Sequence, residues 1–245
     1  MKFSLIPVLF LIQMLAILHA AHHALRRKGR PGYGWFLAMT LILALWGLTS
    51  TWLALSGVYL SRGFLESYPT LWLPFVPVLV VTGMILVFPS ARRAMQVLID
   101  TVPVRWLVGI HALRILALGT LIKAWRGEFS PSFALWVGIP DLMFGLSALW
   151  MMRLGARNRL GDRGLMLWNL LGVLVILPGA PVIGQMGLPG VFHMIDETPS
   201  MVTLYEFPMV LAPSLVVPVF VMMNLFTVIR LWERRGQSSA EVAGI

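Results

Sequence analysis

Two ionisable side chains, Arg114 and Asp141, fall in the middle of long apolar segments of this sequence. Inserting such a group into the hydrocarbon core of a membrane costs roughly 2.5–3.5 kcal/mol or more, so one that is present is a candidate for function. At 1.5 Å per residue, Arg114 lies about 15 Å from the start of its segment and Asp141 about 12 Å from the start of the next. In a core about 30 Å thick, both are expected near the midplane, where adjacent antiparallel helices would pair them.

The neighbours of this pair indicate a polar centre that faces protein rather than lipid. His111 lies three residues before Arg114, so the two share a helical face and an imidazole is expected one turn from the guanidinium. Small residues at three- and four-residue spacing form a stripe along a helix that lets a second helix approach closely. Gly138, Gly145 and Ala148 have this spacing, and Asp141 lies on the same stripe. With Asn169 as a further polar candidate, the predicted substrate-binding residues are His111, Arg114, Asp141 and Asn169.

Two interpretations of this centre stay open. In the functional one, Arg114 holds an anionic group, Asp141 is its counter-ion or a proton acceptor, and His111 tunes the pair. In the structural one, the ion pair locks two helices together and binds no ligand.

Three histidines, His19, His22 and His23, form a second candidate group near the end of the first apolar segment. The spacing places His19 on the same face as the other two, a geometry that can bind a metal ion or supply one axial haem ligand. His19 and His23 are therefore candidate metal ligands, for a metal ion or haem, whereas no other cofactor is expected. Alternatively, these histidines face anionic lipid headgroups, because they lead directly into a run of basic residues.

The sequence as a whole is too apolar for a soluble protein. Of its 245 residues, 58% are hydrophobic and 12% charged, with a mean hydropathy of +0.84, whereas soluble domains carry about 25% charged residues. The sequence has no cysteine, which excludes disulfides, Fe–S clusters, thiolate zinc sites and cysteine nucleophiles. Motifs of phosphate-binding loops, dinucleotide-binding folds and zinc proteases are absent as well.

Seven apolar stretches are each long enough for a helix to cross a membrane, which takes about 20 residues. They cover residues 4–25, 35–60, 71–89, 104–124, 133–152, 165–185 and 208–229. The connections are too short for another domain, so we predict an all-α, seven-helix transmembrane domain over residues 1–235. Residues 236–245 are small and polar and are expected to form a disordered tail.

The basic residues predict the orientation of these helices. Fourteen of the nineteen Lys and Arg residues fall on one side of the predicted spans, four fall on the other, and Arg114 lies within a span. Because short cytoplasmic loops accumulate Lys and Arg, this distribution predicts an external N-terminus and a cytoplasmic C-terminus in a bacterial cytoplasmic (inner) membrane. The basic excess is therefore a topology signal, and no nucleic-acid partner is expected. As an alternative, the first span could be a cleaved signal peptide, although Leu18 and His19 fit its cleavage site poorly.

A stretch rich in proline and glycine, residues 178–190, follows the sixth span. A regular helix cannot pass smoothly through it. Irregular backbone at membrane depth needs protein or water to satisfy its polar groups, so the end of this span lines a cavity or turns back. Alternatively, the helix stops at Leu177 and an interfacial loop follows.

These observations favour a membrane protein that binds or transports a small polar or anionic molecule. A membrane-embedded enzyme acting on a lipid or isoprenoid, with Asp141 as general acid, is an alternative, as is a haem- or metal-binding redox subunit. A structural or assembly subunit would need helix packing alone. The expected partners are the lipid bilayer and a small-molecule ligand, and a homo-oligomer is compatible with the sequence.

Overall fold

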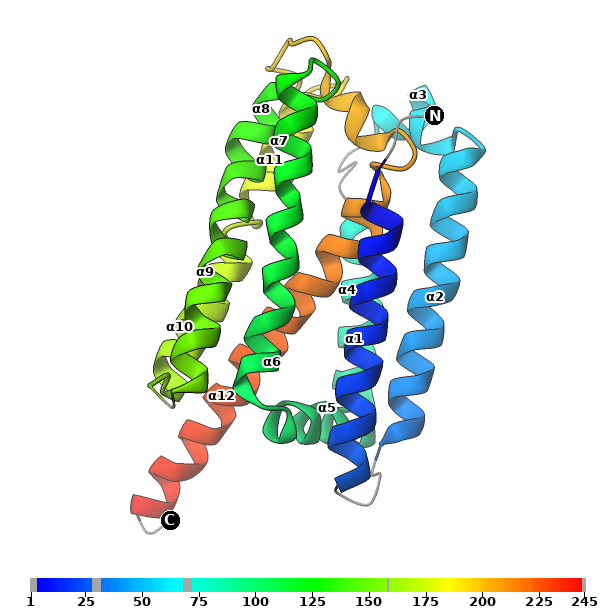
Figure 1. Ribbon diagram of the computed structural model, residues 1–245. Coiled ribbons are helices and arrows are strands. Elements are labelled where there is room, and N and C mark those ends of the chain that lie inside the picture. Colours follow the sequence, from blue (N-terminus) through cyan, green and yellow to red (C-terminus); the bar gives the residue numbers. More distant parts are fainter. Residues whose placement is uncertain (1–3, 28–31, 68–71, 158, 244–245) are drawn as a thin grey trace.

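The computed structural model describes residues 4–27, 32–67, 72–157 and 159–243, and the described residues form helices without a strand (Figure 1). Six helical segments are long and apolar enough to cross a membrane, and one bent pair of helices raises the number to as many as seven. The predicted all-helical membrane fold is thus confirmed, with six to seven spans. The first helix begins at the upper end of Figure 1 and the last helix ends at the lower end.

The helices follow one another with few long connections. In chain order they are α1 (Ile6–Arg27), α2 (Tyr33–Leu55), η1 (Val58–Leu60), α3 (Arg62–Leu65), α4 (Trp72–Val87), α5 (Pro89–Thr101), α6 (Val104–Gly109), η2 (Ile110–Ala117), α7 (Leu118–Trp125), α8 (Pro131–Phe133), η3 (Ala134–Gly138), α9 (Ile139–Ala156), α10 (Asp162–Leu174), α11 (Gly179–Met186), η4 (Met201–Tyr205), η5 (Ala212–Val216) and α12 (Val217–Ala243). Among these, η2 is a 3₁₀ segment and both η3 and η5 are π-helical. The segment η2 lies in the middle of its spanning helix, η3 lies close to the start of its span, and η5 forms the start of the last span.

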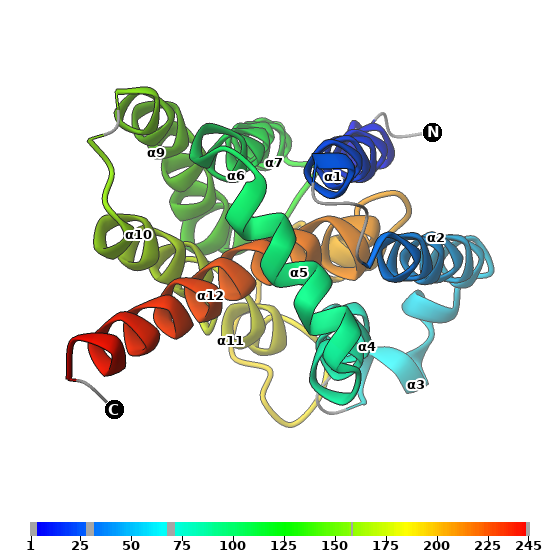
Figure 2. The same cartoon turned by 90° about the horizontal axis from the view of Figure 1, so that it is seen from below.

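The last helix forms the centre of the bundle. In the span that comprises η5 and most of α12, 61% of the residues are buried, against at most 33% in any other span. Seen from below, α12 runs through the middle of the molecule and the other helices surround it (Figure 2). This burial explains why its sequence is apolar on all sides over residues 215–222. The helix continues to Ala243, into the 236–245 segment for which the sequence predicts disorder, and residues 244–245 lie outside the described part.

The third predicted span is bent. The 16 residues of α4 reach about 24 Å, less than the thickness of the hydrocarbon core. At Phe88 the backbone is extended, as expected before a proline, and α5 leaves the axis of α4 at 106°. The buried residues of α5 are Ala91, Ala94, Met95 and Ile99. This amphipathic helix therefore lies across the lower end of the bundle (Figure 1).

Ion pairs hold α5 against α12. The carboxylate of Asp100 accepts hydrogen bonds from Arg230 Nε and Nη2 at 2.9 and 2.6 Å, and from Arg234 Nη2 at 2.6 Å. Glu233 of α12 in turn pairs with Arg92 and accepts a 2.8 Å hydrogen bond from Gln96 Nε2. The lower end of the bundle is thus closed by a network of charges.

The sixth span is broken where the sequence is rich in proline and glycine. The first part, α10, ends at Leu174, and α11 begins at Gly179 after one irregular turn. The chain therefore does not pass into an interfacial loop at Leu177, because a second short helix continues the span. Its irregular part lines a cavity, as described below.

Candidate functional site

Arg114 and Asp141 form the predicted ion pair. Arg114 Nε lies 2.5 Å from Asp141 Oδ1. The side chain of Arg114 is fully enclosed, at 0% exposure, whereas that of Asp141 retains 19%. The pairing and the inward direction expected from the sequence are confirmed, and Asp141 is the member of the pair with accessible surface.

The small residues of α9 bring the two helices together as predicted. A Cβ atom added to Gly145 would lie 2.6 Å from the backbone nitrogen of Ile115 and 2.8 Å from the carbonyl carbon of Arg114. Two turns earlier, a Cβ on Gly138 would lie 3.2 Å from Leu121. The backbone of η2 therefore rests directly on Gly145, and this contact fixes the position of the guanidinium relative to Asp141.

The 3₁₀ geometry of η2 orients the cation. A 3₁₀ helix has three residues per turn, so His111 and Arg114 lie above one another, and a run of eight residues is unusually long. Mid-helix 3₁₀ stretches often mark a functional or strained site. Here the segment contains His111 and Arg114, and the sequence places Arg114 near the midplane.

The break in α10 supplies a second partner for Arg114. The amide of Ile176 donates to the carbonyl of Val173 instead of to Gly172, as a regular helix would require. Arg114 Nη1 donates to the freed carbonyl oxygen of Gly172 at 3.2 Å. The guanidinium thus occupies the C-terminal end of α10, where the helix dipole favours a positive charge.

Aromatic rings enclose the remaining side of the guanidinium. Its central carbon lies 4.3 Å from the ring centroid of Phe144 and 5.7 Å from that of Phe220. Phe144 stacks on Trp168, whose indole nitrogen donates to Ser147 Oγ at 3.0 Å. Such cation–π contacts add about 2 kcal/mol or more where the cation is desolvated. Nη2 of Arg114 is buried without a hydrogen-bond partner among the described residues.

A cavity of about 360 Å³ lies on the upper side of the ion pair. Its walls come from α1, α4, η2, α7, α8, η3, α9, α10, the break that follows it, α11, η4, η5 and α12. Among the described residues that line it, three have polar side chains, Arg114, Thr120 and Asp141. The 3₁₀ segment η2 and both π-helical segments, η3 and η5, contribute to this wall, and π-helical segments are often found at functional sites. The cavity interpretation of the proline- and glycine-rich stretch is supported, because Ile176, Leu177, Ala180 and Pro181 line it.

The other two predicted site residues are placed differently. His111 is 1% exposed and packs against Phe144, Trp168 and Phe220, and both ring nitrogens are buried without a described partner. Asn169 donates from Nδ2 to the carbonyl of Leu165 in its own helix. Neither residue belongs to the described wall of the cavity. Of the four predicted site residues, Arg114 and Asp141 therefore line the cavity, whereas His111 and Asn169 do not.

Sequence reasoning missed one group of this centre, the carbonyl of Gly172, which the proline-rich break could have indicated. Asn224, an intramembrane amide that the sequence offers as a candidate for an interhelical hydrogen bond, is 0% exposed and has both amide atoms buried without a described partner. Its side chain packs on Gly172, since a Cβ there would lie 2.6 Å from Asn224 Nδ2.

The π-helical segment η5 is held by polar contacts from α1 and α2. Pro218 has no amide hydrogen and cannot donate to the carbonyl of Ser214 four residues earlier, and this carbonyl accepts a 2.9 Å bond from Trp46 Nε1. Gln13 Nε2 donates to the carbonyl of Val216 at 3.2 Å. Both bonds fix the part of the last span that faces the cavity.

The histidines near the end of α1 make ring contacts. His19 and His23 meet edge to face with centroids 4.6 Å apart, and His19 lies 6.0 Å from the ring of Trp106. Within the described ranges, no three His, Asp or Glu side chains are grouped as the ligands of a metal ion would be. A metal or haem site at His19 and His23 therefore stays a prediction from spacing.

Comparison with known proteins gives one match. Residues 70–232 match the model of a domain of unknown function, DUF8737. The matched part runs from α4 into α12 and contains Arg114, Asp141 and Gly172, whereas α1 and α2 precede it. No curated protein and no solved structure matches the chain.

Proposed function

Because the chain belongs to the DUF8737 family, and the matched region contains the whole polar centre, we propose its function from that centre. This integral membrane protein binds a small, mostly apolar molecule that carries a hydroxyl or amino group, and Asp141 is the acceptor. The observation that carries the proposal is the accessible carboxylate of Asp141 in a mainly apolar cavity.

Arg114 and Asp141 differ in how accessible they are from the cavity, and this difference determines which ligand group is favoured. Arg114 is enclosed on every side, with Nε on Asp141, Nη1 on Gly172 and its face on Phe144. Asp141 uses Oδ1 for Arg114 and keeps accessible surface in the cavity. A carboxylate accepts hydrogen bonds, so a ligand with a donor fits better than the anionic ligand expected from the sequence.

The size and walls of the cavity support a small ligand. A volume of about 360 Å³ falls at the lower end of the range of about 300–1,000 Å³ typical of ligand sites. Such sites are mainly apolar, with few polar groups that fix orientation. Thr120, whose methyl group lies 3.9 Å from the Cβ position of Gly138, offers a second polar group about one turn from Asp141.

Arg114 has the role of a fixed counter-ion in this proposal. Its two hydrogen bonds and the aromatic contact hold the guanidinium in place, so Asp141 Oδ1 is fixed as well. A ligand that binds Asp141 then meets a preorganised acceptor in a site shielded from water, where a hydrogen bond to a charge contributes about 1.5–3 kcal/mol.

The enzyme alternative has less support than binding. A general acid such as Asp141 needs a second reacting group beside it, and the described wall offers only Thr120 and the enclosed Arg114. Transport, the finer part of the functional hypothesis, additionally requires that the cavity be reached from both faces of the membrane. The cytoplasmic membrane, the external N-terminus and a homo-oligomeric state stay proposals from the distribution of charge and apolar surface.

Binding is tested with 1-aminoanthracene, a small aromatic amine whose fluorescence rises in apolar sites. We expect the purified protein in detergent to bind it above the level of protein-free micelles, and to bind anthracene, which lacks the amine, much more weakly. Asp141→Asn should weaken binding roughly ten- to hundredfold, because the charged acceptor is lost.

Two further variants separate loss of the site from loss of the fold. Ala117→Leu fills the cavity and leaves the ion pair intact, so it should abolish binding. Leu118→Phe changes a neighbouring side chain that is 46% exposed and does not line the cavity, so binding should be unchanged. Equal binding of the amine and anthracene, or full binding by both Asp141→Asn and Ala117→Leu, would overturn the proposal.

A further inference from the structure

A second cavity, of about 550 Å³, lies in the lower half of the bundle and is separate from the first. Its walls come from α1, α2, α4, α5, α6, η2, α9 and α12, and Leu113 of η2 lines both cavities. Six methionines belong to its wall, Met14, Met39, Met95, Met152, Met222 and Met223. Methionine is flexible and fills irregular spaces, so this wall suits an apolar chain of variable shape.

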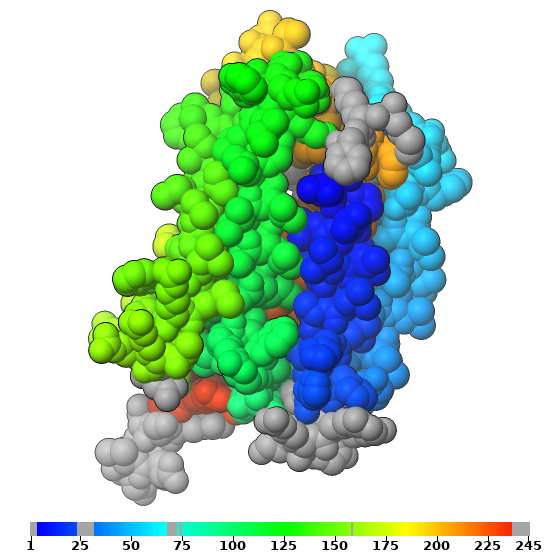
Figure 3. Space-filling model, in the orientation of Figure 1, coloured from blue at the N-terminus to red at the C-terminus, as the bar shows by residue number. Residues whose placement is uncertain are grey.

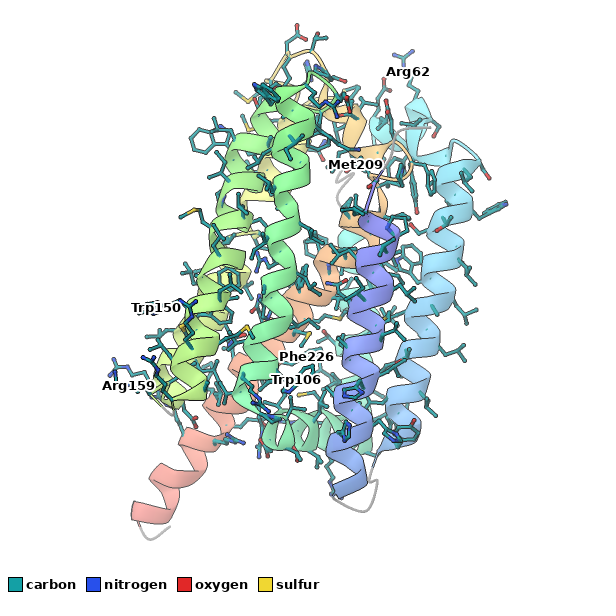
Figure 4. All side chains as sticks on the ribbon, viewed as in Figure 1. Arg62, Trp106, Trp150, Arg159, Met209 and Phe226 are labelled. Atoms are coloured by element: carbon teal, nitrogen blue, oxygen red, sulfur yellow. The ribbon has the colours of Figure 1, made fainter. Side chains whose placement is uncertain are left out.

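The lower cavity opens sideways between α1 and α6. The space-filling view shows a hollow between these helices, with α12 visible behind them (Figure 3). Ile12 of α1, 42% exposed, and Trp106 of α6, 48% exposed, both line the cavity. In Figure 4, Trp106 is seen at the lower end of α6 and Phe226 behind it on α12, and both line the cavity. A lipid chain in the bilayer therefore faces an apolar entrance.

Arg105 gives the rim of this cavity a positive charge. It lines the cavity at the start of α6 and is exposed. Three other arginines at the same end are engaged in ion pairs, since Arg92 pairs with Glu233 while Arg230 and Arg234 pair with Asp100. In the described part of the chain, Arg105 has no hydrogen-bond or ion-pair partner. Its guanidinium is thus free to bind an anion beside the cavity.

The chemistry at the rim and in the wall is that of an amphiphile. A guanidinium donates two parallel hydrogen bonds to a phosphate group. Trp106 lies beside it, as tryptophan does at membrane interfaces. We propose that the lower cavity binds one acyl chain of an anionic phospholipid whose phosphate is held by Arg105. This lipid site does not depend on the ligand proposed for the upper cavity.

Native mass spectrometry of the detergent-purified protein tests this site. The probes are palmitoyl-oleoyl phosphatidylglycerol and the zwitterionic phosphatidylcholine with the same chains. We expect the wild-type protein to retain one molecule of the anionic lipid with about fivefold preference, the effect of one basic residue at a membrane surface. Arg105→Gln should remove the preference, whereas Arg163→Gln, an exposed arginine outside the cavity wall, should keep it.

A second pair of variants tests the cavity rather than the charge. Ala16→Phe fills the cavity from α1 and should prevent retention of either lipid. Leu15→Phe, at a position 56% exposed and outside the wall, should have no effect. Equal retention of both lipids by the wild-type protein, or unchanged retention by Ala16→Phe, would overturn the proposal. The Asp141→Asn variant should retain the anionic lipid, so failure of the upper site is distinguished from failure of this one.

Discussion

Arg114 donates from Nη1 to the carbonyl oxygen of Gly172 across 3.2 Å, at the point where α10 is about to end. The same guanidinium donates from Nε to Asp141 of α9. Three elements, η2, α9 and the broken α10, therefore meet at one positively charged group. Because the half-helix α10 ends with unsatisfied carbonyls and a partial negative charge, a buried cation there is stabilised from two directions.

Replacing one member of the Arg114–Asp141 ion pair should lower the stability of the fold more than replacing both. Asp141→Leu leaves the guanidinium of Arg114 buried with one carbonyl partner, and should lower the stability by about 3–5 kcal/mol. The double variant Arg114→Met/Asp141→Leu replaces the pair by apolar side chains and should unfold near the wild-type temperature. Thermal unfolding followed by tryptophan fluorescence measures both.

The same double variant separates a binding site from a structural lock. If the pair holds a ligand, the folded double variant no longer binds 1-aminoanthracene. A double variant that is stable and binds the amine like the wild type would show that Asp141 only joins helices.

Gly145 is expected to be intolerant of any side chain. In Gly145→Ala the new Cβ meets the backbone of η2 at 2.6 Å, so the helices must separate, at a cost of about 1–3 kcal/mol. Gly83→Ala is the matched control, because nothing lies within 4 Å of its Cβ position and alanine favours a helix by up to about 1 kcal/mol. The unfolding temperature should fall for the first variant and stay level or rise for the second, and the opposite order would refute the close approach.

The ion-pair network of Asp100, Arg230 and Arg234 at the lower end should make the stability of the fold depend on pH. Burial by itself would raise the pKa of Asp100, but hydrogen bonds and charge from Arg230 and Arg234 outweigh it and hold the pKa below its ordinary value. Since the pKa is lower in the folded protein, this stabilisation is present above the ordinary pKa of about 4. It is lost as the pH falls below that value.

Asp100→Asn should therefore be less stable than the wild type at pH 7, and the difference should shrink below about pH 4. Thermal unfolding of both proteins across this range provides the measurement, with Asp196→Asn in the upper loop as a control. A constant difference at all pH values would contradict a role for the ionised carboxylate.

The ion pair could be predicted from the sequence because the depth of each residue in the membrane, and the helical face on which it lies, follow from its position within its own span. Arg114 and Asp141 lie at similar depths in consecutive spans, and the small residue Gly145 marks the face where those spans touch. The same spacing places His111 one turn from Arg114, but it does not show that the imidazole packs against Phe144, Trp168 and Phe220, which come from α9, α10 and α12.

The sequence predicts where some helices are interrupted, but not how the chain continues after each interruption. Prolines and glycines mark the irregular end of the sixth span, yet they do not show that a short helix resumes at Gly179. The 3₁₀ segment η2 carries no proline, and its geometry depends on packing against α9. For the third span, Pro89 indicates an end of the helix, but the 106° bend is set by the burial of the apolar face of α5.

Access to the upper cavity can be measured directly because the chain has no cysteine. Thr120→Cys places a thiol on the cavity wall, whereas Leu118→Cys places one at an exposed apolar position outside it. A water-filled entrance would let a membrane-impermeant thiol reagent modify the first variant and leave the second unmodified. Thr120→Cys should be modified in vesicles that expose the upper end of the bundle, which the distribution of arginines predicts to be external.

Preincubation with 1-aminoanthracene should slow this modification if the amine occupies the same cavity. Modification from the opposite face as well would support transport, because the cavity must then open to both sides during the measurement. If Thr120→Cys resists the reagent from both faces while a cysteine at Glu128, in the upper loop, reacts readily, the cavity does not admit water. Asp141 would then serve only to pair with Arg114.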